Sequence, residues 1–79
     1  MDKAKEFIEN IVTSIVDHPE DVKITVVEGE KSTILELKVN PEDISKVIGK
    51  GGRIARAMRT LIGVIAGRRN KRILLEIIE

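Results

Sequence analysis

The sequence contains no cysteine, one histidine and one aromatic residue, Phe7. Without cysteine, disulfide bonds and thiolate metal sites are excluded, and nothing indicates an oxidising compartment. A single histidine, His18, is too few for a histidine metal centre. No run approaches the roughly 18 apolar residues of a membrane span, and the charged first residues do not resemble a signal peptide. We therefore expect a cytoplasmic protein without a cofactor or a metal ion.

Residue sets typical of catalysis are also missing. The sequence shows no Ser/His/Asp set and no cluster of isolated carboxylates. His18 stands beside an expected helix end without an acid–base partner, so we interpret it as a capping or solvated residue. The length of 79 residues, with 42% hydrophobic and 34% charged side chains, is typical of one small folded domain. We expect a single domain over residues 1–79 that is not an enzyme.

Charge is distributed unevenly along the chain. Residues 1–43 carry 11 acidic and 5 basic side chains, whereas residues 44–79 carry 2 acidic and 9 basic ones. The balances of −6 and +7 almost cancel in the net charge of +1. A basic half rich in arginine suits a polyanion such as nucleic acid. The alternative, a solvated surface whose positive charge pairs with the acidic half, stays open from charge alone.

The first half of the chain is predicted to form a helix followed by a hairpin. Apolar residues recur at helical spacing from about Asp2 to about Asp17, and Pro19 disfavours helical geometry just before it. Apolar and polar residues then alternate over 22–27 and 35–39, which predicts two half-buried strands. The polar turn between these strands contains a glycine and favours an antiparallel hairpin.

The second half of the chain is predicted to form two helices followed by a strand. Asn40 is a favoured N-cap and is followed by proline, so we expect a short helix over 41–48. A second helix is expected from Arg53 to Gly67, with Gly67 as its left-handed cap. The apolar run over 73–78 predicts a strand that is buried on both faces or has a parallel neighbour.

This order of elements predicts an α+β fold with the arrangement α-β-β-α-α-β. Three strands would form one mixed sheet with three helices on one face. The last strand follows a two-helix crossover from the second strand, so these two strands should be parallel.

The loop between the two later helices has three glycines in four residues, Gly49 to Gly52. Glycine allows close approach of a ligand to the backbone, and the start of the following helix favours an anion. Lys50 and Arg53 add positive charge. A phosphate-binding loop of the Gly-Lys-Ser/Thr type is excluded because Gly51 follows Lys50. A dinucleotide fold is excluded because the glycines follow a helix rather than a strand.

The loop and its flanks resemble the Val-Ile-Gly-x-x-Gly-x-x-Ile core of the KH domain, an RNA-binding module. The matching residues run Val47-Ile48-Gly49-Lys50-Gly51-Gly52-Arg53-Ile54, with Ala55 where the family has its later isoleucine. The element order is similar to the bacterial type II form, and the unit covers the whole chain, as in the small stand-alone proteins of the KhpA kind. This resemblance implies RNA binding, homodimers and pairing with a larger KH-domain protein (KhpB, also called Jag or EloR). It also implies a role in post-transcriptional regulation or RNA chaperoning linked to cell elongation and division.

The resemblance implies a groove for about four nucleotides of single-stranded RNA. Its walls would be the glycine loop with its two helices and the neighbouring sheet edge. The three isoleucine and valine side chains before the loop are either a floor for bases or part of the core. Aromatic stacking is nearly excluded, so we expect weak binding with little base preference, and single-stranded DNA stays open. The expected contacts are Ile44, Val47, Ile48, Gly49, Lys50, Gly51, Gly52, Arg53 and Arg56.

The helix expected over 53–67 has an apolar arc of roughly 200°, more than the ~100° that one core contact needs. We expect the stripe of Ile54, Met58, Leu61 and Ile65 to face the sheet. The excess is covered either by the first helix and the sheet or by a second copy in a two-fold pairing. In the second case Ile62 and Val64 would be the contacts, with Gly63 permitting close approach. An interaction subunit for which RNA is secondary is therefore the alternative function, and steep salt dependence would favour RNA.

Overall fold

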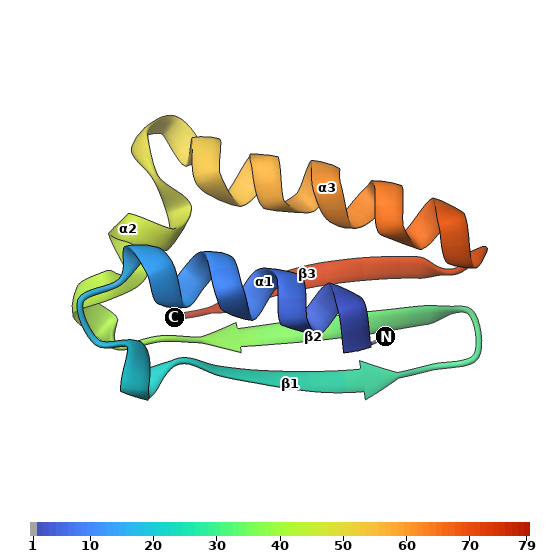
Figure 1. Ribbon diagram of the computed structural model, residues 1–79, viewed down its shortest axis with the longest axis horizontal. Helices are drawn as coiled ribbons and strands as arrows, with labels where there is room; N and C mark the ends of the chain where they lie inside the picture. The colour runs from blue at the N-terminus through green and yellow to red at the C-terminus, as the bar shows by residue number, and fades with distance from the viewer. Residues whose placement is uncertain (1) are drawn as a thin grey trace.

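The computed structural model describes residues 2–79 and has the expected α-β-β-α-α-β order (Figure 1). Single 3-10 turns precede β1, α2 and α3 at Pro19–Asp21, Pro41–Asp43 and Lys50–Gly52. The helices and strands are α1 (Asp2–Ile15), β1 (Lys23–Glu28), β2 (Ser32–Lys38), α2 (Ile44–Ile48), α3 (Arg53–Arg69) and β3 (Arg72–Ile78).

The three strands form one mixed sheet in the order β1-β2-β3. β1 and β2 are antiparallel, with Ile24 opposite Leu37, and β2 and β3 are parallel, with Leu35 opposite Leu75. A parallel neighbour requires a crossover, which α2 and α3 supply. The expected α+β fold with a mixed sheet is confirmed, and β3 lies at a free edge of the sheet.

The helices cover one face of the sheet. Strand residues that point to this face alternate with exposed ones, as in β2, where Thr33, Leu35 and Leu37 are buried. They pack with the apolar sides of α1 and α3. The most deeply buried apolar side chains are Ile8, Val12, Leu35, Leu37, Val47, Met58 and Ile62.

The orientation of α3 differs from the expected one. Its buried residues are Ala55, Met58, Ile62 and Ala66. Leu61 is 46% exposed and Val64 is 60% exposed. The expectation that Leu61 faces the sheet is therefore wrong. An apolar arc twice as wide as one contact needs does not fix which part turns inward, and small residues such as Ala55 and Ala66 let α3 approach the core.

α3 also continues beyond Gly67, which lies inside the helix. The left-handed residue after the helix is Asn70, with φ 55°. The N–H of Asn70 donates to the Gly67 carbonyl and that of Lys71 to the Ala66 carbonyl, which is the Schellman arrangement. Asparagine tolerates this conformation better than other side chains, so Gly67 is not the cap that we expected.

One face of β3 is buried and the other is exposed, so the strand is not buried on both faces. Ile73 and Leu75 point into the core, whereas Leu74 and Ile78 are 41% and 40% exposed on the other face. Of the two explanations for its apolar run, a parallel neighbour is the one that the sheet bears out.

Two side chains fix the segment that leads into α2, where the helix expected over 41–48 divides into the 3-10 turn Pro41–Asp43, capped by Asn40, and α2 over Ile44–Ile48. The expected N-cap is present, because the Asn40 side chain accepts a hydrogen bond from the Glu42 N–H at 2.9 Å. The carboxylate of Asp43 is fully buried and reaches back to the chain after α1. It accepts hydrogen bonds from the N–H groups of Asp17 (3.2 Å) and His18 (3.0 Å) and lies 3.1 Å from His18 Nδ1. Asp43 therefore joins the end of α1 to the start of α2.

This contact shifts both ionisable groups. The hydrogen bond to Asp43 raises the pKa of His18, against a smaller opposing effect of burial. Burial alone would raise the pKa of Asp43, but the hydrogen bonds from Asp17 and His18 outweigh it and the pKa of Asp43 is lowered. His18, interpreted above as a capping or solvated residue, has a defined structural partner.

We predict that this pair makes stability depend on pH in a defined window. A raised histidine pKa stabilises the fold fully below the unfolded value of 6.5 and loses that effect as pH rises through the folded value. A lowered aspartate pKa stabilises the fold above its unfolded value of 3.8. The contribution is greatest between these values. The melting temperature of the parent should rise from about pH 8 to about pH 5.5 more than that of His18→Gln. Equal changes in the two proteins would contradict the contact.

Candidate nucleic-acid interface

The glycine loop starts where α2 ends, and its first residue must be glycine. Gly49 has φ 79° and ψ 170°, a conformation that is essentially restricted to glycine. A Cβ atom there would lie 2.7 Å from Cγ1 of Ile54 and 3.0 Å from its backbone nitrogen. Ile54 therefore packs directly on Gly49. This contact gives a physical reason for an isoleucine shortly after the glycines.

The rest of the loop exposes its backbone. The Gly52 N–H donates to the Gly49 carbonyl at 3.0 Å, which closes a tight turn. Gly52 is the N-cap of α3 in the left-handed conformation, and no side chain accepts a hydrogen bond from the first turn of α3. The Arg53 N–H donates to the Lys50 carbonyl, and the other N–H groups of this turn have no side-chain cap at the positive end of a 17-residue helix. Around Gly51 there is open space.

Two cations at the loop have no acidic partner. Lys50 and Arg53 are exposed, and neither forms an ion pair within residues 2–79. Arg56 is the third cation among the expected RNA contacts. Its Nη2 donates to the Gly51 carbonyl at 2.9 Å, and this hydrogen bond supports the loop. Lys46 forms an ion pair on the other side of α2, with its Nζ 3.2 Å from the Asp17 carboxylate. Lys50 and Arg53 are the cations best placed for a phosphate.

Sequence reasoning missed Arg59, which links α3 to the sheet edge. Its Nη2 donates to the carbonyl oxygen of Leu75 on β3 at 3.4 Å. The partner is neutral, so this contact leaves the arginine charge uncompensated. This contact could not be predicted from the sequence, because no residue pattern determines how α3 lies against β3.

The apolar residues before the loop divide into core and surface. Val47 is fully buried and belongs to the core, so its side chain does not offer a floor for bases. Of the two roles left open for Val47, the core role is the one that its burial supports. Ile44 is half-buried and packs against the core, and Ile48 is half-buried beside Gly49.

Two hollows occur elsewhere on the molecule. One of about 620 Å³ lies where the β1–β2 turn meets the end of α3. The other, of about 410 Å³, is lined by Lys3, Phe7, Ile65, Arg68 and Arg69, between α1 and α3. Neither is lined by loop residues, so the groove expected between the loop and the sheet edge stays a prediction.

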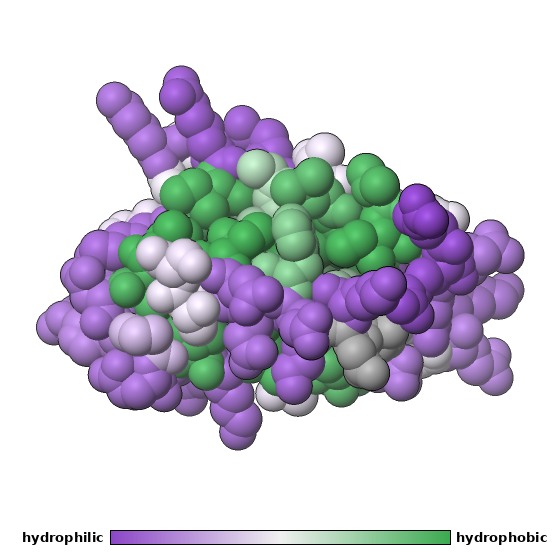
Figure 2. Space-filling view, viewed as in Figure 1, coloured by the Kyte–Doolittle hydropathy of each residue, from purple (hydrophilic) through white to green (hydrophobic). Residues whose placement is uncertain are grey.

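An apolar area covers part of the helix face. Figure 2 shows apolar side chains gathered over α3 and between α3 and α1, with polar side chains around them. Leu61 and Val64 are its exposed α3 members, and Gly63 has open space around it. Ile62, an expected dimer contact, is only 1% exposed and lies in the core, so its side chain cannot meet a second copy.

Among residues 2–79, no helix combines the length and the apolar character needed to cross a membrane.

Comparison with known proteins gives a consistent match over nearly the whole chain. The family described as "KhpA/KhpB, KH domain" matches residues 5–77. The chain is similar to the RNA-binding protein KhpA of Borreliella burgdorferi, with 57% identity over 74 residues, 94% of this chain and 90% of that protein. The KhpA of Clostridium perfringens is also 57% identical, over 94% of this chain and 99% of that protein. The KhpA of Aquifex aeolicus is 44% identical over the full length of both.

Proposed function

The chain belongs to the KhpA/KhpB family of KH domains, and we propose that it binds short single-stranded RNA at the loop Gly49–Gly52 without catalysing a reaction. The observation that carries this proposal is the loop itself, where exposed backbone, a helix start without a side-chain cap and two cations without acidic partners meet. The relatives named RNA-binding protein KhpA support RNA as the ligand.

In this proposal Lys50 and Arg53 meet phosphates, while the glycines let the RNA backbone approach the loop. The bases lie toward Ile48 and the free edge of β3. Such a site takes about four nucleotides. The only aromatic residue, Phe7, packs against the core, so stacking worth about 1–3 kcal/mol per base is missing. One copy then binds weakly and with little base preference.

The proposal includes a homodimer through the exposed side of α3. Leu61 and Val64 lie about 60° apart on this side at 100° per residue, which supports a two-fold pairing of the same helix, whereas Gly63 lies on the other flank of α3. Two copies place two weak sites on one RNA and raise the overall affinity. The family resemblance further supports a cytoplasmic role in RNA regulation or chaperoning linked to cell elongation and division, with a larger KhpB-type protein as an additional partner.

The same apolar area favours a second candidate, an interaction subunit in which RNA binding is secondary. Association through Leu61 and Val64 is driven by apolar burial and changes little with salt, whereas phosphate binding weakens steeply as salt rises. The two functions are therefore separable by variants that affect only one surface.

The test of the RNA site is the double variant Lys50→Asp/Gly51→Asp. It places two carboxylates where a phosphate is expected. Gly51 has open space around it but φ 63°, a left-handed conformation that strains most side chains and that aspartate tolerates better than most. We expect RNA affinity to fall by about tenfold or more at low salt. Fluorescence anisotropy with a six-nucleotide RNA measures this change.

The matched control is Lys23→Asp/Thr25→Asp, which makes the same charge change on the exposed side of β1. The control should bind RNA with nearly the parent affinity, and both variants should keep the parent circular dichroism spectrum. Parent-like binding by the loop variant would contradict the proposed site.

For the dimer, we predict that Val64→Lys gives a folded monomer. A lysine at this 60% exposed position leaves the core unchanged but places a charge in the proposed apolar contact. Leu74→Lys, on the opposite face of the sheet and 41% exposed, is the control that should stay dimeric. Sedimentation velocity at high micromolar concentration distinguishes the two states. A monomeric parent protein would show that α3 does not pair.

A further inference from the structure

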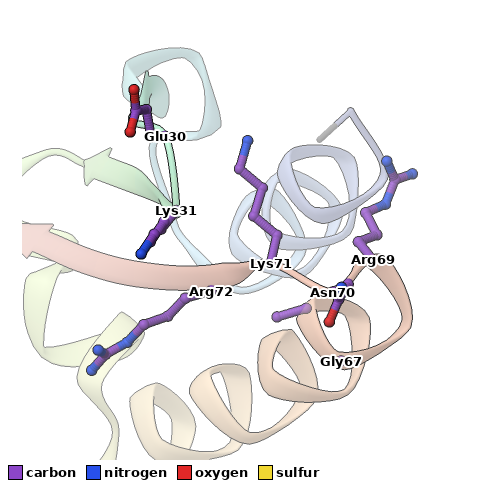
Figure 3. A pocket seen from close by; sticks show the side chains of 8 residues that line it. Glu30, Lys31, Gly67, Arg69, Asn70, Lys71 and Arg72 are labelled. Carbon is purple, nitrogen blue, oxygen red and sulfur yellow. The ribbon is translucent and has the colours of Figure 1, made fainter.

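The hollow where the β1–β2 turn meets the end of α3 collects positive charge from three segments (Figure 3). Lys31 comes from the turn, Arg69 from the last turn of α3, Lys71 from the position before β3 and Arg72 from the first position of β3. The side chains of Arg69 and Arg72 point to opposite sides of the hollow (Figure 3). The Arg72 N–H donates to the Lys31 carbonyl at 3.3 Å, which holds the turn against β3. The cluster is therefore produced by the fold and not by neighbouring positions alone.

Most of this charge is not neutralised within the molecule. Lys71 lies 3.5 Å from the Glu28 carboxylate, and Glu30 also lines the hollow. Lys31, Arg69 and Arg72 form no ion pair within the described residues 2–79. The hollow is therefore lined by four cations and one carboxylate, and the second carboxylate, Glu28, pairs with Lys71.

The end of a helix favours cations, but this effect explains only part of the cluster. The partial negative charge at the end of α3 accounts for Arg69 and the neighbouring Arg68. Lys31 and Arg72 belong to a turn and a strand, and the helix end gives no reason for their placement. Gly67 also lines the hollow, and a Cβ there would meet nothing within 4 Å, so the space above this residue is open. A hollow of about 620 Å³ has room for a phosphate and its sugar.

We propose that this cluster, defined as Lys31, Arg69, Lys71 and Arg72, is a second contact surface for the RNA backbone. The inference rests on the proposed function, because the strand would be the same one that the glycine loop holds. The two surfaces lie at opposite ends of α3, whose 17 residues are about 25 Å long at 1.5 Å per residue. If the phosphates follow one another at about 3.4 Å, the spacing along one strand of a DNA duplex, about seven nucleotides cover this length.

Further charge lies between the two ends. Arg59 is on α3 between the loop and the cluster, and it contacts the free edge of β3 through the Leu75 carbonyl. Arg72 stands at the start of the same strand. Arginine suits such a path because its planar guanidinium forms two hydrogen bonds with a phosphate. RNA of about 12 nucleotides should then bind more tightly, and with a steeper salt dependence, than RNA that fills the loop site alone.

The experiment compares a four-nucleotide and a twelve-nucleotide oligouridylate on the full-length protein. The test variant is Lys31→Gln/Arg69→Gln/Arg72→Gln, which neutralises the three unpaired cations and leaves the Lys71 ion pair intact. The control is Lys5→Gln/Lys23→Gln/Lys38→Gln, with the same change of charge away from the cluster. Affinity is measured by fluorescence anisotropy at several salt concentrations.

We expect the test variant to lose about tenfold to a hundredfold in affinity for the longer RNA near 0.05 M salt. Its slope of log K against log salt should become shallower by about 2 units, since three phosphate contacts are removed at about 0.7 each. Binding of the four-nucleotide RNA should stay at the parent level, and the control should bind both RNAs as the parent does.

Parent-like binding of the longer RNA by the test variant overturns the inference while the loop site stands. An equal loss with both RNAs, or an equal loss in the control, overturns it as well, because the effect would then be one of net charge. If the parent binds neither RNA, the proposed function itself fails. Binding of polyglutamate in preference to the longer RNA would assign the cluster to an acidic protein instead.

Discussion

The buried carboxylate of Asp43 is the contact on which the placement of the loop depends. Asp43 lies at the start of α2, and its carboxylate is in hydrogen-bonding contact with three groups of the chain just after α1. A carboxylate removed from water is costly unless its acceptor capacity is used. Here that capacity is used to join two segments 25 residues apart in sequence. α2 is only five residues long and could not hold its position by its own hydrogen bonds. Fixing its start against α1, and burying Val47 beneath it, determines where the helix ends and the glycine loop begins.

From that point the loop is shaped by a steric constraint. Ile54 fills the space in which a side chain at Gly49 would lie, so the backbone must turn sharply between α2 and α3. The turn leaves the first N–H groups of α3 without a side-chain acceptor. In a purely structural turn these groups would ordinarily be capped. A helix start without a side-chain cap, flanked by Lys50 and Arg53, favours a phosphate. This is why the loop, rather than either hollow, carries the proposed function.

Much of the fold could be predicted from the sequence, because its signals are local. Alternation in the strands, the Asn40 cap and the glycine-rich loop each gave an element that the structure contains. The errors concern the packing of α3. Its apolar arc is too wide to show whether Leu61 or Ile62 turns inward. Packing against the sheet and α1 determines which of the two is buried. Gly67 looked like a cap, but Asn70 takes that conformation because the helix reaches Arg69. The contacts of Asp43 and the basic cluster each join residues that are distant in the sequence, so no local pattern predicts them. Lys50 and Arg53 could be predicted because they lie within the motif itself.

The central claim is that RNA is held through its phosphates at the loop. The most direct test is the salt dependence of binding for a six-nucleotide single-stranded RNA. With Lys50, Arg53 and one further cation engaged, about three phosphates are neutralised, and log K should fall by about 2 units per tenfold rise in salt concentration. A slope close to zero would show that phosphate contacts do not drive binding, and it would contradict the account of this surface as a nucleic-acid interface.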